Sequence, residues 1–287
     1  MSIKFGINGK AAGIGSVFVG DENGKAQRVV NGWIGDENGK AQRIFSSIKP
    51  SFSVKVHGDR FGFNIQGDRL SVDWGDGTTE ALSGGTSSHS YSMTGDYTVT
   101  LTGTFLSISF QNQTALTEVL TPFQKDTAVM DFAACFQNCT SLTAIPTGLF
   151  DNCTAVTSFR SCFSGCTSLT AIPTGLFDNC TAAKNFAACF SGCTSLTAIP
   201  TGLFDNCTAV TNFASCFSGC TSLTAIPAGL FDNCTAVMDF GACFSGCTAI
   251  TSAVPELWVT HSSANGAACY RNCTRAANYA DVPSRWR

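Results

Sequence analysis

The sequence predicts a mostly β protein with short helical turns: β-hairpins at the N-terminus, a strand-rich middle segment, and a C-terminal solenoid of about six 27-residue coils. Three observations lead to this order. The chain opens with a 15-residue repeat, its middle alternates apolar and polar residues, and its second half repeats every 27 residues. A fixed period of about 20–50 residues is typical of stacked repeats, in which each unit buries its apolar face against the next.

Residues 1–47 form the first predicted unit. The peptide GDENGKAQR occurs at 20–28 and again at 35–43, flanked by apolar residues such as Val19 and Trp33. Asn-Gly at 23–24 and 38–39 is a strong signal for a tight hairpin turn. Two tandem hairpins have little core of their own, so we expect them to dock on another protein.

Residues 48–105 form the second predicted unit. The segment LSVDWGDGTTEAL (70–82) contains a Gly-Asp-Gly turn, and HSYSMTGDYTVTLTG (89–103) alternates through Tyr97, Val99 and Leu101. Such alternation is typical of half-buried strands, so this unit is predicted to consist of strands and hairpins. Asp73 and Asp76 lack the spaced oxygen ligands of a calcium loop and are interpreted as turn residues.

Residues 106–287 form the predicted solenoid. The peptide CFSGCTSLTAIPTGLFDNC (162–180) returns almost unchanged at 189–207 and 216–234. Each half of the period contains an aromatic residue, two polar residues, Cys, Thr and then alternating apolar residues. This pattern predicts two units per coil, each a helical turn or loop that leads into a short strand. Gln113 and Asp126 replace Cys upstream, and the repeat loses its register after Val254, so both ends are predicted to be caps.

The sixteen cysteines all lie between Cys135 and Cys273. Free cysteine behaves as a small buried hydrophobe, so we favour packing inside the coils. Two alternatives stay open. Identical positions on adjacent coils would lie about 4.8 Å apart, within the Cα range of a disulfide, although assembly in a cytosol opposes oxidation. Zinc would need thiolates from separate coils at a spacing that is unusual for this metal. The sequence predicts no cofactor and no metal site.

Composition and motifs exclude several functions. A net charge of −3 with 13% charged residues gives no footprint for nucleic acid. No apolar run reaches the roughly 18–20 residues that span a bilayer, and the N-terminus lacks the apolar core of a signal peptide, so we expect a chain made in a cytosol. His57, His89 and His261 lie in no nucleophile motif, and the repeated cysteines are interchangeable, so no enzyme is predicted.

Variation between otherwise matching coils marks candidate binding residues. The segments MDFAAC (130–135), TSFRSC (157–162), KNFAAC (184–189), TNFASC (211–216) and MDFGAC (238–243) keep their Phe while its neighbours change polarity. The changing columns are therefore predicted to face solvent and to align into a stripe. Relaxed drift on an exposed edge is the alternative interpretation. The predicted binding residues are Asp131, Ser158, Arg160, Lys184, Asn185, Asn212 and Asp239.

Two resemblances bear on the fold. The segments VDWGDGTT and HSYSMTGDYTVTLTG resemble the polycystic-kidney-disease (PKD) type of domain, which implies an immunoglobulin-like β-sandwich at 48–105. The segment SCFSGCTSLTAIPTGLFDNCTAVTSF resembles the bacterial surface-protein type of leucine-rich repeat, which implies a leucine-rich-repeat solenoid at 106–287. Gln113, Asp126 and HSSANGAAC (261–269) depart from that repeat at its two ends.

A third resemblance bears on function. The doubled VFVGDENGKAQRVV and the closing CYRNCTRAANYADVPSRWR are similar to segments of tail-associated or fibre-like proteins from phages and prophages of gut Firmicutes. That family is thought to contain virion-surface adhesins. The resemblance implies a protein located on the virion and made in the host cytoplasm.

The expected function is that of a non-enzymatic virion surface protein, tail-associated or decorating. Residues 1–47 would bind a virion structural protein, and the solenoid would bind a host-surface glycan or protein. No nucleic acid and no membrane is expected as a partner, and the sequence leaves a homo-oligomer open. A bacterial cell-surface adhesin and a purely structural virion protein are the alternatives.

Overall fold

The computed structural model describes residues 18–20, 26–28, 33–35, 41–43, 51–124 and 128–287. The chain separates into two compact units, Met1–Lys49 and Pro50–Arg287. Within the described residues, none of the helices combines the length and apolar character that a membrane span requires. The described secondary structure is mostly β, with very few helices.

The first unit contains two short antiparallel pairs. β1 (Phe18–Gly20) pairs with β2 (Ala26–Arg28), and β3 (Trp33–Gly35) pairs with β4 (Ala41–Arg43). Each pair therefore joins the two sides of one copy of the 15-residue repeat. The predicted Asn-Gly turns at 23–24 and 38–39 lie outside the described residues, as does most of the predicted anchor at 1–47.

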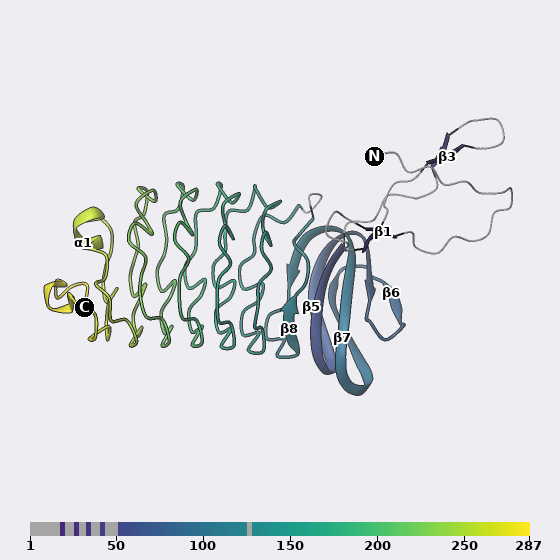
Figure 1. The fold of residues 1–287 in the computed structure, drawn as a ribbon, viewed down its shortest axis with the longest axis horizontal. Coiled ribbons are helices and arrows are strands. Elements are labelled where there is room, and N and C mark those ends of the chain that lie inside the picture. The colour runs from purple at the N-terminus through teal and green to yellow at the C-terminus, as the bar shows by residue number, and fades with distance from the viewer. Residues whose placement is uncertain (1–17, 21–25, 29–32, 36–40, 44–50, 125–127) are drawn as a thin grey trace. The chain divides into compact units, whose positions relative to one another are not determined.

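The second unit begins with a four-stranded antiparallel sheet (Figure 1). Its strands are β5 (Ser51–Asp73), β6 (Thr79–Ala81), β7 (Gly85–Ser109) and β8 (Leu116–Val119). The order is β6-β5-β7, and β8 also pairs with β5. Phe52, Val54 and Val56 are buried at every second position of β5, as expected for a strand with one face on a core.

The two long strands of this sheet take part in more than one stretch of pairing. Thr102 of β7 lies opposite both Ser51 and Ser71, and Asn64 of β5 lies opposite both Thr86 and Ser109. Irregular register between Gly58 and Arg60 and between Asp68 and Ser71 accompanies these changes of partner. The strands expected to form a sandwich are thus one hydrogen-bonded sheet, and the boundary expected after residue 105 lies inside β7.

From Phe110 onward the chain forms successive coils, drawn from teal to yellow in Figure 1, which we call the coil stack. Backbone hydrogen bonds join one coil to the next: the N–H groups of Phe132, Phe159 and Phe186 donate to carbonyls 26 residues later, at 2.8–2.9 Å. One parallel bridge per coil runs through Asp131, Ser158, Asn185, Asn212, Asp239 and Asn265.

The prediction of two short strands in each coil is wrong. The described residues between 120 and 256 contain turns and isolated bridges but no strand. The extended backbone at each bridge is short, because a residue in the left-handed region lies three positions after each bridge residue of the Asp131–Asn265 series and ends it. These left-handed residues have φ of 54–57° and are Ala134, Ser161, Ala188, Ser215, Ala242 and Ala268.

Three columns of stacked rings fill the coil stack, with ring centroids of successive coils 5.2–5.9 Å apart. Phe110, Phe136, Phe163, Phe190, Phe217, Phe244 and Tyr270 form one column; Phe123, Phe150, Phe177, Phe204 and Phe231 another; and Phe132, Phe159, Phe186, Phe213 and Phe240 the third. Phe52 of β5 stacks on Phe123 at 4.3 Å with an interplanar angle of 2°. The sheet and the coils therefore share one core.

The cysteines pack between these rings. All sixteen are free and buried. In one column the thiol donates to a Phe carbonyl of the preceding coil: Cys166 to Phe136 and Cys193 to Phe163, both at 3.1 Å. Burial with a hydrogen-bond partner is what the packing interpretation expects of a small, weakly polar side chain.

Both ends of the coil stack are covered by atypical residues. Gln113 occupies the Cys column of the first coil, and its Oε1 accepts the N–H of Gly62 on β5 at 3.1 Å. At the other end, buried Trp286 lies so close to Gly266 that an added Cβ would meet the indole at 2.2 Å. Asp126, the other departure from Cys, lies outside the described residues.

Candidate functional site

Five of the seven predicted binding residues lie in one column of the coil stack, which we call the Asx column. Its members all place a side-chain oxygen against the backbone N–H two residues later, and they are Asp131, Ser158, Asn185, Asn212 and Asp239. The distance is 2.7–2.9 Å for the Asp and Asn members and 3.4 Å for Ser158. These side chains therefore hold the turn that follows them.

The Asx column is less exposed than the sequence predicts. Ser158, Asn185, Asn212 and Asp239 are half-buried, and Asp131 is exposed. Their main chains form the bridges between coils, and their side chains lie against the backbone because they accept hydrogen bonds from its N–H groups. Of these five predicted residues only Asp131 is exposed, and the binding role of the column stays a prediction.

Arg160 and Lys184, the two remaining predicted residues, have exposed side chains. Lys184 belongs to a neighbouring column, which we call the variable column: Met130, Thr157, Lys184, Thr211 and Met238. Each member after the first donates its N–H to the carbonyl of the member before it, at 2.8–2.9 Å. One side chain per coil is thereby presented along five successive coils.

Sequence reasoning missed five residues of these columns: Met130, Thr157, Thr211 and Met238 of the variable column, and Asn265 of the Asx column. Met130 and Met238, at the two ends of the variable column, are 58% and 66% exposed. Asn265 continues the Asx column, and its Nδ2 donates to Asp239 at 2.9 Å. The spacing from Asp239 to Asn265 is one residue shorter than the repeat, which hides it from a 27-residue alignment.

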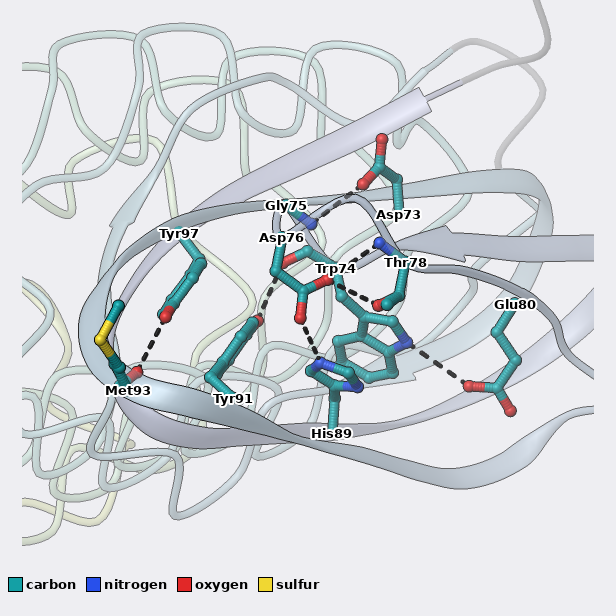
Figure 2. A network of polar contacts seen from close by, with 10 residues as sticks. All are labelled: Asp73, Trp74, Gly75, Asp76, Thr78, Glu80, His89, Tyr91, Met93 and Tyr97. Atoms are coloured by element: carbon teal, nitrogen blue, oxygen red, sulfur yellow. Dashed lines mark hydrogen bonds and ion pairs between the residues drawn. The ribbon is translucent and has the colours of Figure 1, made fainter.

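The second candidate site is the Asp-Trp-Gly-Asp-Gly turn after β5 (Figure 2). The Asp73 carboxylate accepts the N–H of Gly75 at 2.9 Å. Asp76 Oδ1 accepts both the N–H and the hydroxyl of Thr78, at 3.0 and 2.6 Å. Its Oδ2 lies 2.7 Å from Nε2 of His89 on β7. Both carboxylates are thus used by the turn, as the sequence predicts.

Electrostatics and stacking support a structural role for this turn. The hydrogen bonds from Thr78, followed by that from His89, lower the pKa of Asp76 to about 2. The Trp74 indole stacks on His89 at 5.0 Å, and the Tyr91 hydroxyl donates to the carbonyl of Trp74 at 3.0 Å. Tyr91 in turn stacks on Tyr97 at 3.7 Å. One network therefore connects β7 to the turn, as Figure 2 shows.

The sheet and its turn carry the features of a known domain. Residues 47–114 match the PKD domain family. The PKD domain of this chain thus includes β5, β6 and β7 together with the turn of Figure 2, and it ends in the first coil. The comparison of the whole chain with curated proteins found no match.

The thiols of the coils are poor nucleophiles in the folded protein. Burial raises the pKa of Cys153 and Cys207 to about 12, and that of Cys193 well above its usual range. A reactive cysteine needs the opposite shift, toward the thiolate. Among the residues that the structure describes, no three or more His, Cys, Asp or Glu side chains are grouped so that they could hold a metal ion.

Proposed function

We propose that this protein is a non-enzymatic virion surface protein, tail-associated or decorating, which attaches through residues 1–47 and presents the coil stack to the host surface. We further infer that the coil stack is a solenoid of the bacterial surface-protein type of leucine-rich repeat. The variable column carries the proposal, because it displays changing side chains on a framework that is otherwise repeated.

The contrast between framework and display supports binding. The rings of Phe159 and Phe186 are fully buried and stack at 5.2 Å, so the interior of neighbouring coils is nearly the same. In the variable column the side chain changes from Met to Thr to Lys between coils of the same geometry. Repeat proteins use such aligned positions as extended binding surfaces.

The side chains of the proposed surface suit contact without strong ionic capture. Thr157 and Thr211 offer hydroxyl groups, Met130 and Met238 offer exposed apolar area, and Lys184 adds one charge. Mixed polar and apolar surface of this kind is typical of non-obligate protein interfaces. A glycan or a protein on the host surface is therefore the proposed partner.

The non-enzymatic part of the proposal rests on the cysteines. They are the most intrinsically nucleophilic side chains that recur in the coils, and burial raises the pKa of each shifted thiol, as for Cys220, which rises to about 12. A thiol of this kind suits packing better than attack on a substrate.

Labelled full-length protein added to candidate host cells tests the proposal. The double variant Arg160→Glu with Lys184→Glu should bind at least about tenfold less, because it reverses both exposed positive charges of the predicted stripe. Asp178→Lys, a charge reversal at an exposed position of another column, is the matched control and should bind as the wild type does. Equal binding by the wild type, the double variant and the control would show that the predicted stripe does not contact the host cell.

The two alternative functions predict different results. A purely structural virion protein would be found in particles but would bind no cells. A bacterial cell-surface adhesin would be absent from particles and present on a cell envelope. Cryo-electron microscopy of the intact particle, together with cell fractionation, distinguishes the proposed function from both.

A further inference from the structure

A polar groove lies where the PKD domain meets the first coil. Its volume is about 510 Å³, and it is lined by β5 (60–64), β7 (86–88 and 109) and the connection at 111–115. This volume is within the range of small-molecule sites, which is roughly 300–1,000 Å³. Residues far apart in the sequence thus come together around one hollow.

The chemistry of the groove is neutral and rich in hydrogen-bonding side chains. Amide and hydroxyl groups predominate in its lining, including those of Asn64, Thr86, Ser88, Gln111, Gln113 and Thr114. Among the described residues that line it, only Arg60 is charged, and none is a carboxylate. Amides and hydroxyls both donate and accept hydrogen bonds, which matches the hydroxyl groups of a saccharide.

Several of these side chains are already held in place. Asn64 Nδ2 donates to the Thr86 hydroxyl at 3.0 Å, which aligns the two across the β5–β7 pair. Gln113 Oε1 accepts the Gly62 N–H at 3.1 Å. These bonds use the amide nitrogen of Asn64 and the oxygen of Gln113, so the opposite end of each amide stays available for a ligand. Preorganised groups lose less entropy when a ligand binds.

The floor of the groove argues against an added peptide strand. At Asn64, β5 is paired on both sides, with Thr86 and with Ser109. The N–H of Gly62 is already bound to Gln113. A peptide that extends the sheet needs free main-chain groups at an edge. Here the ligand would be recognised by side chains instead.

We propose that this groove is a saccharide-binding site. It deepens the proposed function and rests on it in one respect, namely that the ligand would be a glycan of the host surface. The absence of carboxylates from the described lining favours binding over hydrolysis, since glycoside cleavage uses a pair of carboxyl groups.

The site is tested by titrating the full chain with neutral trisaccharides of glucose, galactose, N-acetylglucosamine or rhamnose. The NMR chemical shifts of the side-chain amides report binding. At least one of the trisaccharides should bind and shift the amide signals of Asn64 and Gln113. Asn64→Ala should weaken that binding at least about tenfold, and Ser88→Trp should abolish it by filling the groove, while both variants keep the wild-type melting temperature. Thr170→Ala, an exposed change on the coil stack, is the control and should leave binding unchanged.

The outcomes separate this inference from the proposed function. The groove is not a saccharide site if none of the trisaccharides binds, or if Ser88→Trp leaves their binding unchanged. Binding of a synthetic decapeptide pool in place of saccharides would also overturn the proposal. If the protein binds host cells and the groove variants bind them equally well, the proposed function stands and the groove fails. If saccharide binds in the groove but no cell is bound, the groove stands and the proposed function fails.

Discussion

Burial decides the chemistry of the cysteine side chains. It raises the pKa of Cys153, Cys207 and Cys234 to about 12, so the thiolate fraction at about pH 8 is on the order of 0.0001. An exposed thiol with a pKa of about 8.5 would be roughly a quarter ionised. A thiolate with a higher pKa is a stronger nucleophile, but this gain in reactivity compensates only partly for the smaller thiolate fraction.

We therefore expect iodoacetamide to label the folded protein at least about 100-fold more slowly than the unfolded chain. Mass spectrometry of adducts formed with and without concentrated guanidinium chloride measures both rates. All sixteen thiols should react in the unfolded chain, because all are free. Rapid labelling of the folded protein would contradict the packing of the thiols.

Asp76 makes the stability of the fold depend on pH. Its pKa is lowered by hydrogen bonds, whereas the pKa values of the thiols are raised by burial. Its folded pKa is lowered to about 2, so the carboxylate stabilises the fold above its unfolded pKa of about 4, and this contribution is lost as the pH falls toward 2. Asp76→Asn keeps the shape and loses the charge. In urea unfolding, wild type should be more stable than the variant near pH 6, and the two should converge near pH 2. A difference that stays constant with pH would contradict this account.

The Asx column shows what sequence variation reveals about single residues and what it leaves out. The repeat located every member up to Asp239, but variation alone does not say where a side chain points. Asp131, Ser158 and Asn185 differ in charge, yet each accepts the N–H two residues later. That shared property is the signature of a turn, and it explains the substitutions without a ligand.

At the scale of one coil, a central ring carries much of the packing. Phe177 stacks between Phe150 and Phe204 at 5.8 and 5.9 Å, and it contacts Phe159 and Phe186 at 4.8 Å. Phe177→Ala should lower the free energy of unfolding by about 3–5 kcal/mol, because it removes a fully surrounded ring. Guanidinium unfolding followed by circular dichroism measures the loss.

An exposed position of the same coil is the control for this prediction. Thr174→Ala should change the free energy of unfolding by less than about 0.5 kcal/mol. If Phe177→Ala cost as little as Thr174→Ala, the ring columns would not be the core that stabilises the stack.

The period of the sequence located the coils but not their backbone. Alternating apolar residues predicted short strands, whereas the structure has single bridges followed by left-handed residues such as Ser161 and Ala188. Neither Ser nor Ala is a typical residue for that region, so no local signal marks the change of direction. Stacking against both neighbouring coils overrides the local preference.

For the whole second unit, the sequence predicted the order of the parts but not their continuity. From the sequence, the PKD motifs and the 27-residue repeat are expected to be separate domains, because no period connects them. The link is made by rings that are distant in sequence: Phe52 stacks on Phe123, and Phe61 lies 6.0 Å from Phe110. Gln113, which looked like an irregular end, binds Gly62 and closes the same junction.

This shared core predicts that the PKD domain and the neighbouring coils unfold together. In repeat proteins each unit is stabilised by its interfaces with adjacent units, so an intact junction makes the sheet act as the first unit of the stack.

Phe52→Ala should lower the free energy of unfolding by about 3–5 kcal/mol, because it removes a buried ring from this junction. Under mild denaturant, hydrogen exchange by mass spectrometry should show β5 and the coil N–H groups opening at one rate in the wild type and at two rates in the variant. Val99→Ala, which removes buried sheet volume opposite Val54 but leaves both rings of the Phe52–Phe123 pair in place, should lower stability while keeping one rate. Two rates in the wild type would mean that the sheet and the coils fold as independent domains in spite of the stacked rings.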